Sequence, residues 1–191
     1  MEYTLEERAQ LIIEACLSNK SNDPVKIFRE IANKDFVRMH GPEHHILDGA
    51  SILTAYHNAG GNIDLESSLE KVLAEGLRMP AGACGMWGVC GAVTSVGVAM
   101  WLIDRTRNDE VEPSKLWGTR MSATSNAVQA MGELGGPRCC KRDGFIALTE
   151  AIKYINENYE VQLPLTDIKC GFFGRNDQCI KDRCPYNPEA K

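Results

Sequence analysis

The chain has 191 residues, with 21 lysines and arginines against 26 aspartates and glutamates, which gives a formal net charge of −5. This length supports one domain with its own core, and a content of 43% hydrophobic residues excludes a disordered chain. The mild negative charge argues against a nonspecific binder of nucleic acid or of anionic membranes.

The pattern of the chain predicts about seven helices. A capping residue, a proline or a glycine break marks each predicted start: Thr4, Asp23-Pro24, Gly41-Pro42, Asp64, Gly85, Pro113-Ser114 and Asp143. Apolar residues recur at helical spacing after these positions. A short strand over 159–163 is the one exception, and it has no visible partner strand. We therefore expect an all-α, single compact helical domain over residues 1–191.

Residues 79–103 carry no charge and are long enough to span a bilayer. Glycines, cysteines and hydroxyl side chains dilute the apolar content, so we expect a buried helix from about Gly85 to Ile103. The N-terminus lacks a basic stretch followed by an apolar run, which predicts no secretion signal. We expect a cytoplasmic, reducing location, where cysteines more often bind metals or act as redox thiols than form disulfides.

The composition of residues 165–191, which show no helical or strand periodicity, predicts an irregular, Cys-rich C-terminal tail folded onto the helices. Cys170, Cys179 and Cys184 follow the spacing C-x8-C-x4-C-P, which matches neither the paired C-x2-C of zinc sites nor the bacterial ferredoxin pattern. An irregular segment of this kind needs a clamp to hold its shape. We expect the three thiols to bind a metal or cluster with one more thiolate. The alternative is a tail of solvated or partly buried thiols.

Cys139 and Cys140 precede a predicted helix start, and Arg138, Lys141 and Arg142 surround them. A helix N-terminus and nearby cations both stabilise a thiolate, so we expect a lowered pKa and a reactive or metal-binding thiol. Neighbouring side chains diverge, so one of the two is expected to face the site while the other packs. The alternative is that both are buried apolar residues.

Two further motifs add candidate residues. Cys84 and Cys90 lie in a glycine-rich segment, where the backbone can approach a cofactor or another helix closely. Three histidines and Glu43 lie within six residues, which favours a metal site or a general acid/base beside a cysteine. In the alternative, one of these histidines caps, one is buried and one is exposed.

The candidate residues fall into three groups. The catalytic candidates are Cys139, Cys140 and His44. The cofactor-binding candidates are Cys84, Cys90, Trp87 and Arg138. The candidate metal ligands are Cys170, Cys179, Cys184, Cys140, Cys84, His40, His44 and His45.

Four strings resemble an uncharacterised domain family of strictly anaerobic bacteria and methanogenic archaea: His40-Gly41-Pro42-Glu43-His44-His45, the segment from Cys84 to Ala92, the segment from Gly135 to Arg142, and Cys170-Gly171-Phe172. The resemblance covers the chain from about Phe36 onward and implies no particular activity. It implies methyltransferase-like domains as neighbours. Cys90-Gly91-Ala92 with Gly97 is more loosely similar to the redox-active C-GCAxxG-C-C proteins, from which the histidines and the tail depart.

We expect an iron–sulfur or thiolate-metal protein of anaerobic metabolism that transfers electrons or sulfur, with an iron–sulfur cluster as cofactor and zinc as the runner-up. One alternative is a metal- or cysteine-dependent enzyme acting on a small thiol or methylated substrate. Another is an interaction module whose structural metal orders the tail. The expected partner is a redox or methyltransferase protein rather than nucleic acid or membrane. A homodimer stays open, because glycine-rich helices pack within one chain or between two.

Overall fold

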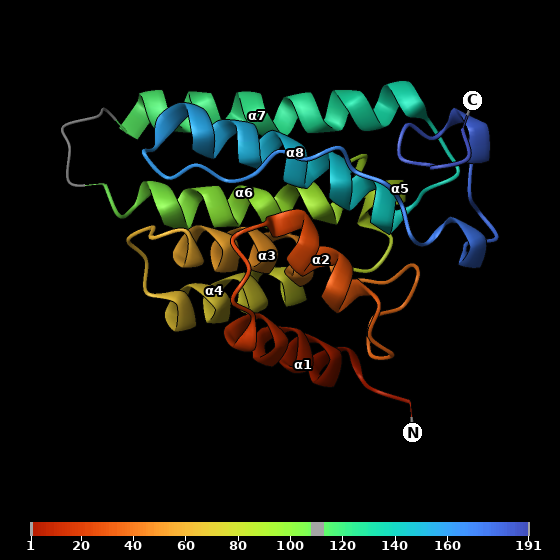
Figure 1. Ribbon diagram of the computed structural model, residues 1–191, viewed down its shortest axis with the longest axis horizontal. Helices are drawn as coiled ribbons and strands as arrows, with labels where there is room; N and C mark the ends of the chain where they lie inside the picture. The colour runs from red at the N-terminus through yellow and green to blue at the C-terminus, as the bar shows by residue number, and fades with distance from the viewer. Residues whose placement is uncertain (1, 108–112, 191) are drawn as a thin grey trace.

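The computed structural model describes residues 2–107 and 113–190, and within them the chain is helical with no strand. The prediction of an all-α fold is confirmed, with eight α-helices in the described part (Figure 1). They are α1 (Leu5–Ser18), α2 (Pro24–Ala32), α3 (His44–Asn58), α4 (Leu65–Arg78), α5 (Ala83–Trp87), α6 (Gly91–Asp104), α7 (Pro113–Leu134) and α8 (Cys140–Asn158). Two single-turn 3-10 helices follow, η1 (Phe173–Arg175) and η2 (Lys181–Arg183).

Several helix starts follow directly from local hydrogen bonds. Thr4 caps α1 in a capping box, in which the Glu7 N–H donates to Thr4 Oγ1 at 3.1 Å and the Thr4 N–H donates to the Glu7 carboxylate at 2.7 Å. Asp23 accepts two backbone N–H groups of α2, and Asp64 accepts one from α4. These predicted starts are confirmed.

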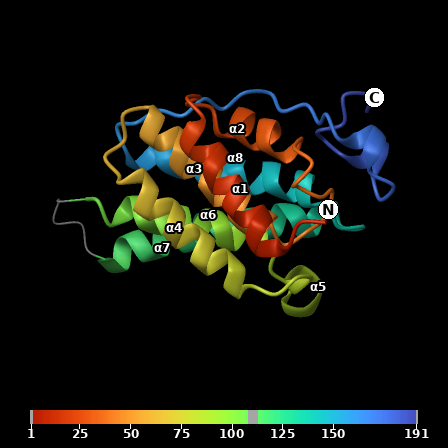
Figure 2. The same ribbon diagram turned by 90° about the horizontal axis from the view of Figure 1, so that it is seen from below.

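The uncharged segment is two helices rather than one. α5 ends at Trp87, Gly88 has a φ of +68°, and α6 begins only at Gly91. A left-handed residue cannot continue a right-handed helix, so the predicted helix from Gly85 to Ile103 is wrong at its start. Figure 2 shows α5 standing apart from the other helices. In residues 2–107 and 113–190, no helix has both the length and the hydropathy required to cross a bilayer.

Two other local predictions are wrong. α8 begins at Cys140 rather than after Asp143, because Cys139 takes the capping position and its Sγ accepts the Arg142 N–H at 3.4 Å. Residues 159–163 form no strand, since the described part of the chain offers no second strand to pair with them.

α3 occupies the centre of the molecule and packs against α1, α2, α4, α6 and α8. Glycine permits the closest of these crossings. A Cβ at Gly49 of α3 would lie 2.4 Å from the Ser95 carbonyl oxygen of α6. A Cβ at Gly144 of α8 would lie 2.5 Å from Asp48 Oδ1 of α3. These close crossings set the positions of the N-terminal ends of α3, α6 and α8, which line one pocket.

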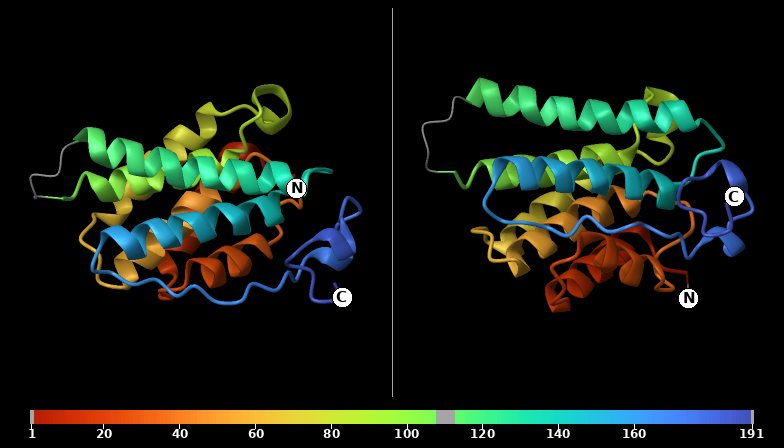
Figure 3. Two further views of the ribbon diagram at one scale, coloured as in Figure 1. Left: turned by 90° about the horizontal axis from the view of Figure 1, so that it is seen from above. Right: turned by 45° about the horizontal axis from the view of Figure 1, so that its top comes forward.

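The C-terminal tail returns along α8 to the end at which α8 begins (Figures 1 and 3). Aromatic rings hold it there. The ring centroid of Phe145, a fully buried residue of α8, lies 6.4 Å from that of Phe172 and 5.3 Å from that of Tyr186. The Cys170 N–H donates to the Tyr186 carbonyl at 2.7 Å. The return brings the tail cysteines to the start of α8, beside Cys139.

Candidate functional site

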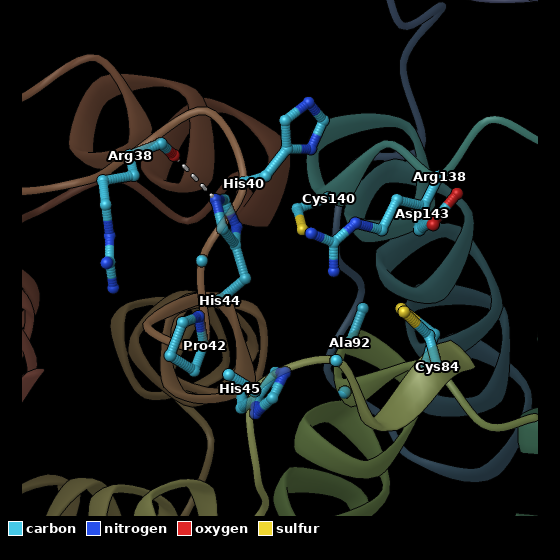
Figure 4. A pocket seen from close by; sticks show the side chains of 15 residues that line it. Arg38, His40, Pro42, His44, His45, Cys84, Ala92, Arg138, Cys140 and Asp143 are labelled. Carbon is cyan, nitrogen blue, oxygen red and sulfur yellow. Dashed lines mark hydrogen bonds between the residues drawn. The ribbon is translucent and has the colours of Figure 1, made fainter. Parts of the chain in front are cut away.

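The N-terminal ends of α3, α6 and α8 surround a pocket of about 340 Å³, shown in Figure 4. The first turns of a helix leave N–H groups unpaired and carry a partial positive charge. Most of the chemically active candidates line this pocket. The lining residues with polar or sulfur side chains are Arg38, His40, His44, His45, Cys84, Cys90, Arg138, Cys140 and Asp143.

A buried ion pair builds the loop that carries the histidines. The fully buried Glu43 carboxylate accepts the Arg38 backbone N–H at 2.7 Å, Arg38 Nε at 3.1 Å and Arg38 Nη2 at 2.7 Å. Gly41 leaves room for this arrangement, because a Cβ there would lie 2.2 Å from the Glu43 carboxylate. Glu43 thereby fixes the loop between His40 and His44 and neutralises Arg38.

His44 and Lys141 form a buried pair at the wall of the pocket. Lys141 Nζ lies 2.9 Å from His44 Nε2 and donates to the Arg38 carbonyl at 3.0 Å. Burial, followed by the Lys141 charge, lowers the pKa of His44 well below its ordinary value. Burial also lowers the pKa of Lys141 to about 8. At neutral pH the pair is therefore a neutral imidazole beside a charged amine that titrates close to neutrality.

Several buried polar atoms around α3 have no hydrogen-bond partner within the described part of the chain. They are Nδ1 of His40, His44 and His45 and both carboxyl oxygens of Asp48. Burial raises the pKa of Asp48 well above its ordinary value. Folded proteins pair nearly all their buried polar groups, so unpaired atoms beside a pocket indicate where a bound molecule or water makes contact.

Three thiols line the same pocket, from Cys84, Cys90 and Cys140. Burial raises the pKa of Cys140 to about 11 and raises that of Cys139 as well. The predicted lowering of these two values is wrong, since the loss of solvent outweighs the nearby cations. Arg138, an exposed residue, lines the pocket together with Cys140. Within residues 2–107 and 113–190, its side chain makes no hydrogen bond or ion pair.

Cys139 faces a different cavity. Cys139, Cys170, Cys179 and Cys184 line a space of about 20 Å³ on the other side of the α8 start. The predicted divergence of Cys139 and Cys140 is confirmed, but each lines a site of its own. Of the predicted metal ligands, Cys84, Cys140 and the three histidines line the pocket, and the other three line the tail cavity. Cys139, predicted as a catalytic residue, lies with these tail cysteines instead.

The pocket and the tail cavity are separate but joined through Asn176. Its Oδ1 lies 3.0 Å from His40 Nε2, and its Nδ2 donates to Cys139 Sγ at 3.3 Å. Nowhere in the described ranges do three or more histidine, cysteine or acidic side chains form a group arranged to hold a metal ion.

Trp87 lies outside the pocket. It is 59% exposed at the end of α5 and lines a neighbouring groove with Met79 and Thr94. Lys141 was not predicted as a functional residue; in the sequence it counted only as a charge near Cys139 and Cys140. The signal was present, since Lys141 shares a helical face with Phe145 and Leu148, and both of these are buried.

Comparison with known proteins gives one match. A family model described as a family of unknown function (DUF5714) matches residues 12–187. No curated protein and no solved structure matches the chain.

Proposed function

The chain belongs to the DUF5714 family, and because the function of that family is unknown, we propose a function from the pocket itself. We propose an enzyme that binds a small anionic molecule in the pocket and transfers a proton to or from it. His44 is the proton-transferring group, Arg138 binds the anion, and Cys140 is the thiol that the bound molecule meets. The observation that carries this proposal is the buried His44–Lys141 pair at the wall of a pocket with unpaired acid/base groups.

Three features favour an anionic ligand. The pocket faces the N-terminal ends of three helices, each of at least 14 residues. Arg38 and Arg142 are already paired with Glu43 and Asp143. Arg138 lines the pocket with no acidic partner among the described residues, and the Lys141 ammonium behind His44 adds a second positive charge.

The His44–Lys141 pair can act as a general acid. His44 Nε2 lies near both the Lys141 ammonium, at 2.9 Å, and the Arg38 carbonyl, at 3.3 Å, and the step uses the tautomer that carries its proton on Nδ1. When the bound molecule reaches the buried Nδ1 and takes this proton, Nε2 takes one from Lys141. The imidazole stays neutral and Lys141 ends as a neutral amine, so the proton count balances. Because the pKa of Lys141 is about 8, this donor is charged at neutral pH and is lost as the pH rises above that value.

The first experiment compares two alkylating reagents at Cys140. Iodoacetate is a small carboxylate and iodoacetamide is its neutral counterpart; each forms a C–S bond and releases iodide. The ratio of their rates at Cys140 cancels the fraction of thiolate and reports attraction of the anion. We expect Arg138→Gln to lower the iodoacetate/iodoacetamide ratio at least about fivefold, equivalent to an exposed ion pair of about 1 kcal/mol. Peptide mass spectrometry measures both rates.

Two control variants separate the effect of the positive charge at position 138 from the effect of a change in side-chain shape. Arg138→Lys retains the cation and should retain most of the ratio, and Arg105→Gln, at the other end of α6, should leave it unchanged. Small anions that slow the reaction with iodoacetate then become substrates to assay for turnover, which His44→Gln should abolish. A ratio that is the same in Arg138→Gln as in the wild type would overturn the proposed anion site.

A second candidate function is transfer of electrons or sulfur by an iron–sulfur cluster. It is favoured by Cys84, Cys90 and Cys140, which line one pocket. The test is the absorption spectrum and elemental analysis of protein purified without oxygen. A brown protein that contains iron and sulfide and loses both in Cys84→Ser would favour this candidate over the acid/base enzyme. A colourless protein free of iron would exclude it.

A further inference from the structure

Four thiols converge at the tail cavity from two distant parts of the chain. Cys139 precedes α8, and the other three lie in the tail around η1 and η2. The cavity measures about 20 Å³, close to the space that one water molecule occupies. It has room for a single ion and none for an organic molecule.

Backbone N–H groups donate to three of these four sulfurs, and they oppose the burial that raises the pKa of Cys139 and of Cys170. The Phe172 N–H donates to Cys170 Sγ at 3.3 Å, the Lys181 N–H donates to Cys179 Sγ at 3.4 Å, and the Arg142 N–H donates to Cys139 Sγ at 3.4 Å. Hydrogen bonds donated to a thiolate favour it over the thiol. Lys181 adopts a φ of +48°, a conformation that is costly for a residue other than glycine.

A buried cation at the same cavity points to negative charge inside it. The Arg142 side chain is 4% exposed, and its Nε and Nη2 are paired with Asp143 and the Pro137 carbonyl. Its Nη1 is buried with no partner in the described part of the chain. Folded proteins seldom leave such a donor unpaired, and a set of thiolates in the cavity would accept from it.

We propose that Cys139, Cys170, Cys179 and Cys184 bind one zinc ion as a tetrahedral tetrathiolate site that clamps the tail onto α8. Zinc prefers four thiolates in closed structural sites, and the cavity suits one ion better than a cluster. On binding, each thiol forms a Zn–S bond and releases its proton to solvent, so four protons leave for one zinc ion. No redox change is involved.

The tail has to move to complete this site, because in the described part of the chain its thiols do not form a group arranged for a metal ion. Outside η1 and η2, the backbone from 165 to 190 adopts no helix or strand that would resist such a movement. Phe172 and Tyr186 stay packed against Phe145 and keep the thiols near one another. Zinc binding and closure of the tail are therefore expected to occur together.

The test begins with full-length protein stripped of metal under reducing conditions. Adding zinc should protect Cys139, Cys170, Cys179 and Cys184 from N-ethylmaleimide and leave Cys84 and Cys140 as reactive as before. Cobalt should bind in a ratio of one ion per chain and give the strong near-ultraviolet absorption of thiolate-to-cobalt charge transfer. No protection by zinc, or equal protection of Cys140, would overturn the proposal. This measurement needs no variant, so failure to fold cannot obscure it.

Matched variants then identify the ligands. Cys139→Ser should weaken cobalt binding more than about tenfold, whereas the neighbouring Cys140→Ser should leave it unchanged. Equal losses in the two variants would contradict the assignment. Two or more iron atoms bound with sulfide at these four cysteines would contradict the proposal that the site holds a single ion. The alkylation ratio at Cys140 tests the proposed function separately, so either proposal can fail while the other stands.

Discussion

Cys139 and Cys140 are adjacent in the chain but belong to two regions that differ in almost every physical respect. Cys140 lines a pocket of about 340 Å³, and Cys139 lines a cavity of about 20 Å³. In the described ranges, three imidazole nitrogens at the pocket lack partners. At the cavity, within the same ranges, one Arg142 nitrogen lacks a partner, and most sulfurs already accept N–H groups. The difference teaches that the space available, rather than the number of cysteines, separates a site for a molecule from a site for an ion.

The two regions also differ in what holds them. The pocket lies between the ends of helices that cross closely at glycines, so its walls depend on the helical core. The cavity has one helical wall, and its other walls are irregular tail anchored by Phe172 and Tyr186 on Phe145. Changes to the core should therefore affect both regions, and changes to the tail should affect the pocket only through the contact of Asn176 with His40.

The largest effect is expected for Phe145→Ala, which removes the ring shared by the core and the tail. Phe145 is fully buried, and its ring centroid lies 5.4 Å from that of Phe28. Loss of a buried phenylalanine costs about 3–5 kcal/mol, and we expect this decrease in the free energy of unfolding by urea. The tail thiols should also react faster with N-ethylmaleimide.

Phe173→Ala is the matched control, since Phe173 lines the same cavity but is only partly buried. It should change the reactivity of the tail thiols with a much smaller loss of stability. Equal losses in the two variants would show that the tail is as integral to the core as α8 itself.

Much of the fold could be predicted because its signals are local. The caps at Thr4, Asp23 and Asp64 depend on residues within one turn. The break at Gly88 could not be predicted, because glycine is equally compatible with a helix and with the left-handed turn that ends one.

The site was predicted as a set of residues but not as an arrangement. The histidines and thiols were identified correctly as neighbours in sequence, yet the meeting of Cys139 with the tail depends on the return of the chain along α8. The direction of the thiol pKa shifts was wrong for the same reason. Burial is a property of the whole fold and outweighs the charges next to Cys140 in the sequence.

The pH dependence of the free energy of unfolding tests whether the Lys141 amine is buried beside His44. The pKa of Lys141 falls from 10.5 to about 8 on folding, so the charged amine destabilises the fold at neutral pH. The unfolded chain binds more protons here between these values, so this contribution to stability rises with pH. The free energy of unfolding of the wild type, minus that of Lys141→Met, should increase by about 2 kcal/mol between about pH 8 and about pH 10. Urea unfolding at both values measures it, and a constant difference would show that the amine is not buried as described.

Two glycines of α6 are expected to have small effects of opposite sign, and of the two only Gly91 lines the pocket. A Cβ at Gly91 would lie 1.9 Å from the ring of His45, so Gly91→Ala has to displace that ring and should cost about 1–3 kcal/mol. A Cβ at Gly97 meets only Thr124, at 3.5 Å, so Gly97→Ala should instead stabilise the helix by about 0.5–1 kcal/mol.

The reactivity of the thiols in Gly91→Ala tests how independent the pocket and the tail cavity are. Gly91→Ala should change the reactivity of Cys140, because His45 lines the same pocket, and should leave the protection of Cys139 by zinc intact. If protection of Cys139 fell together with the reactivity of Cys140, the contacts through Asn176 would couple the two sites, and the pocket and the cavity would act as one unit.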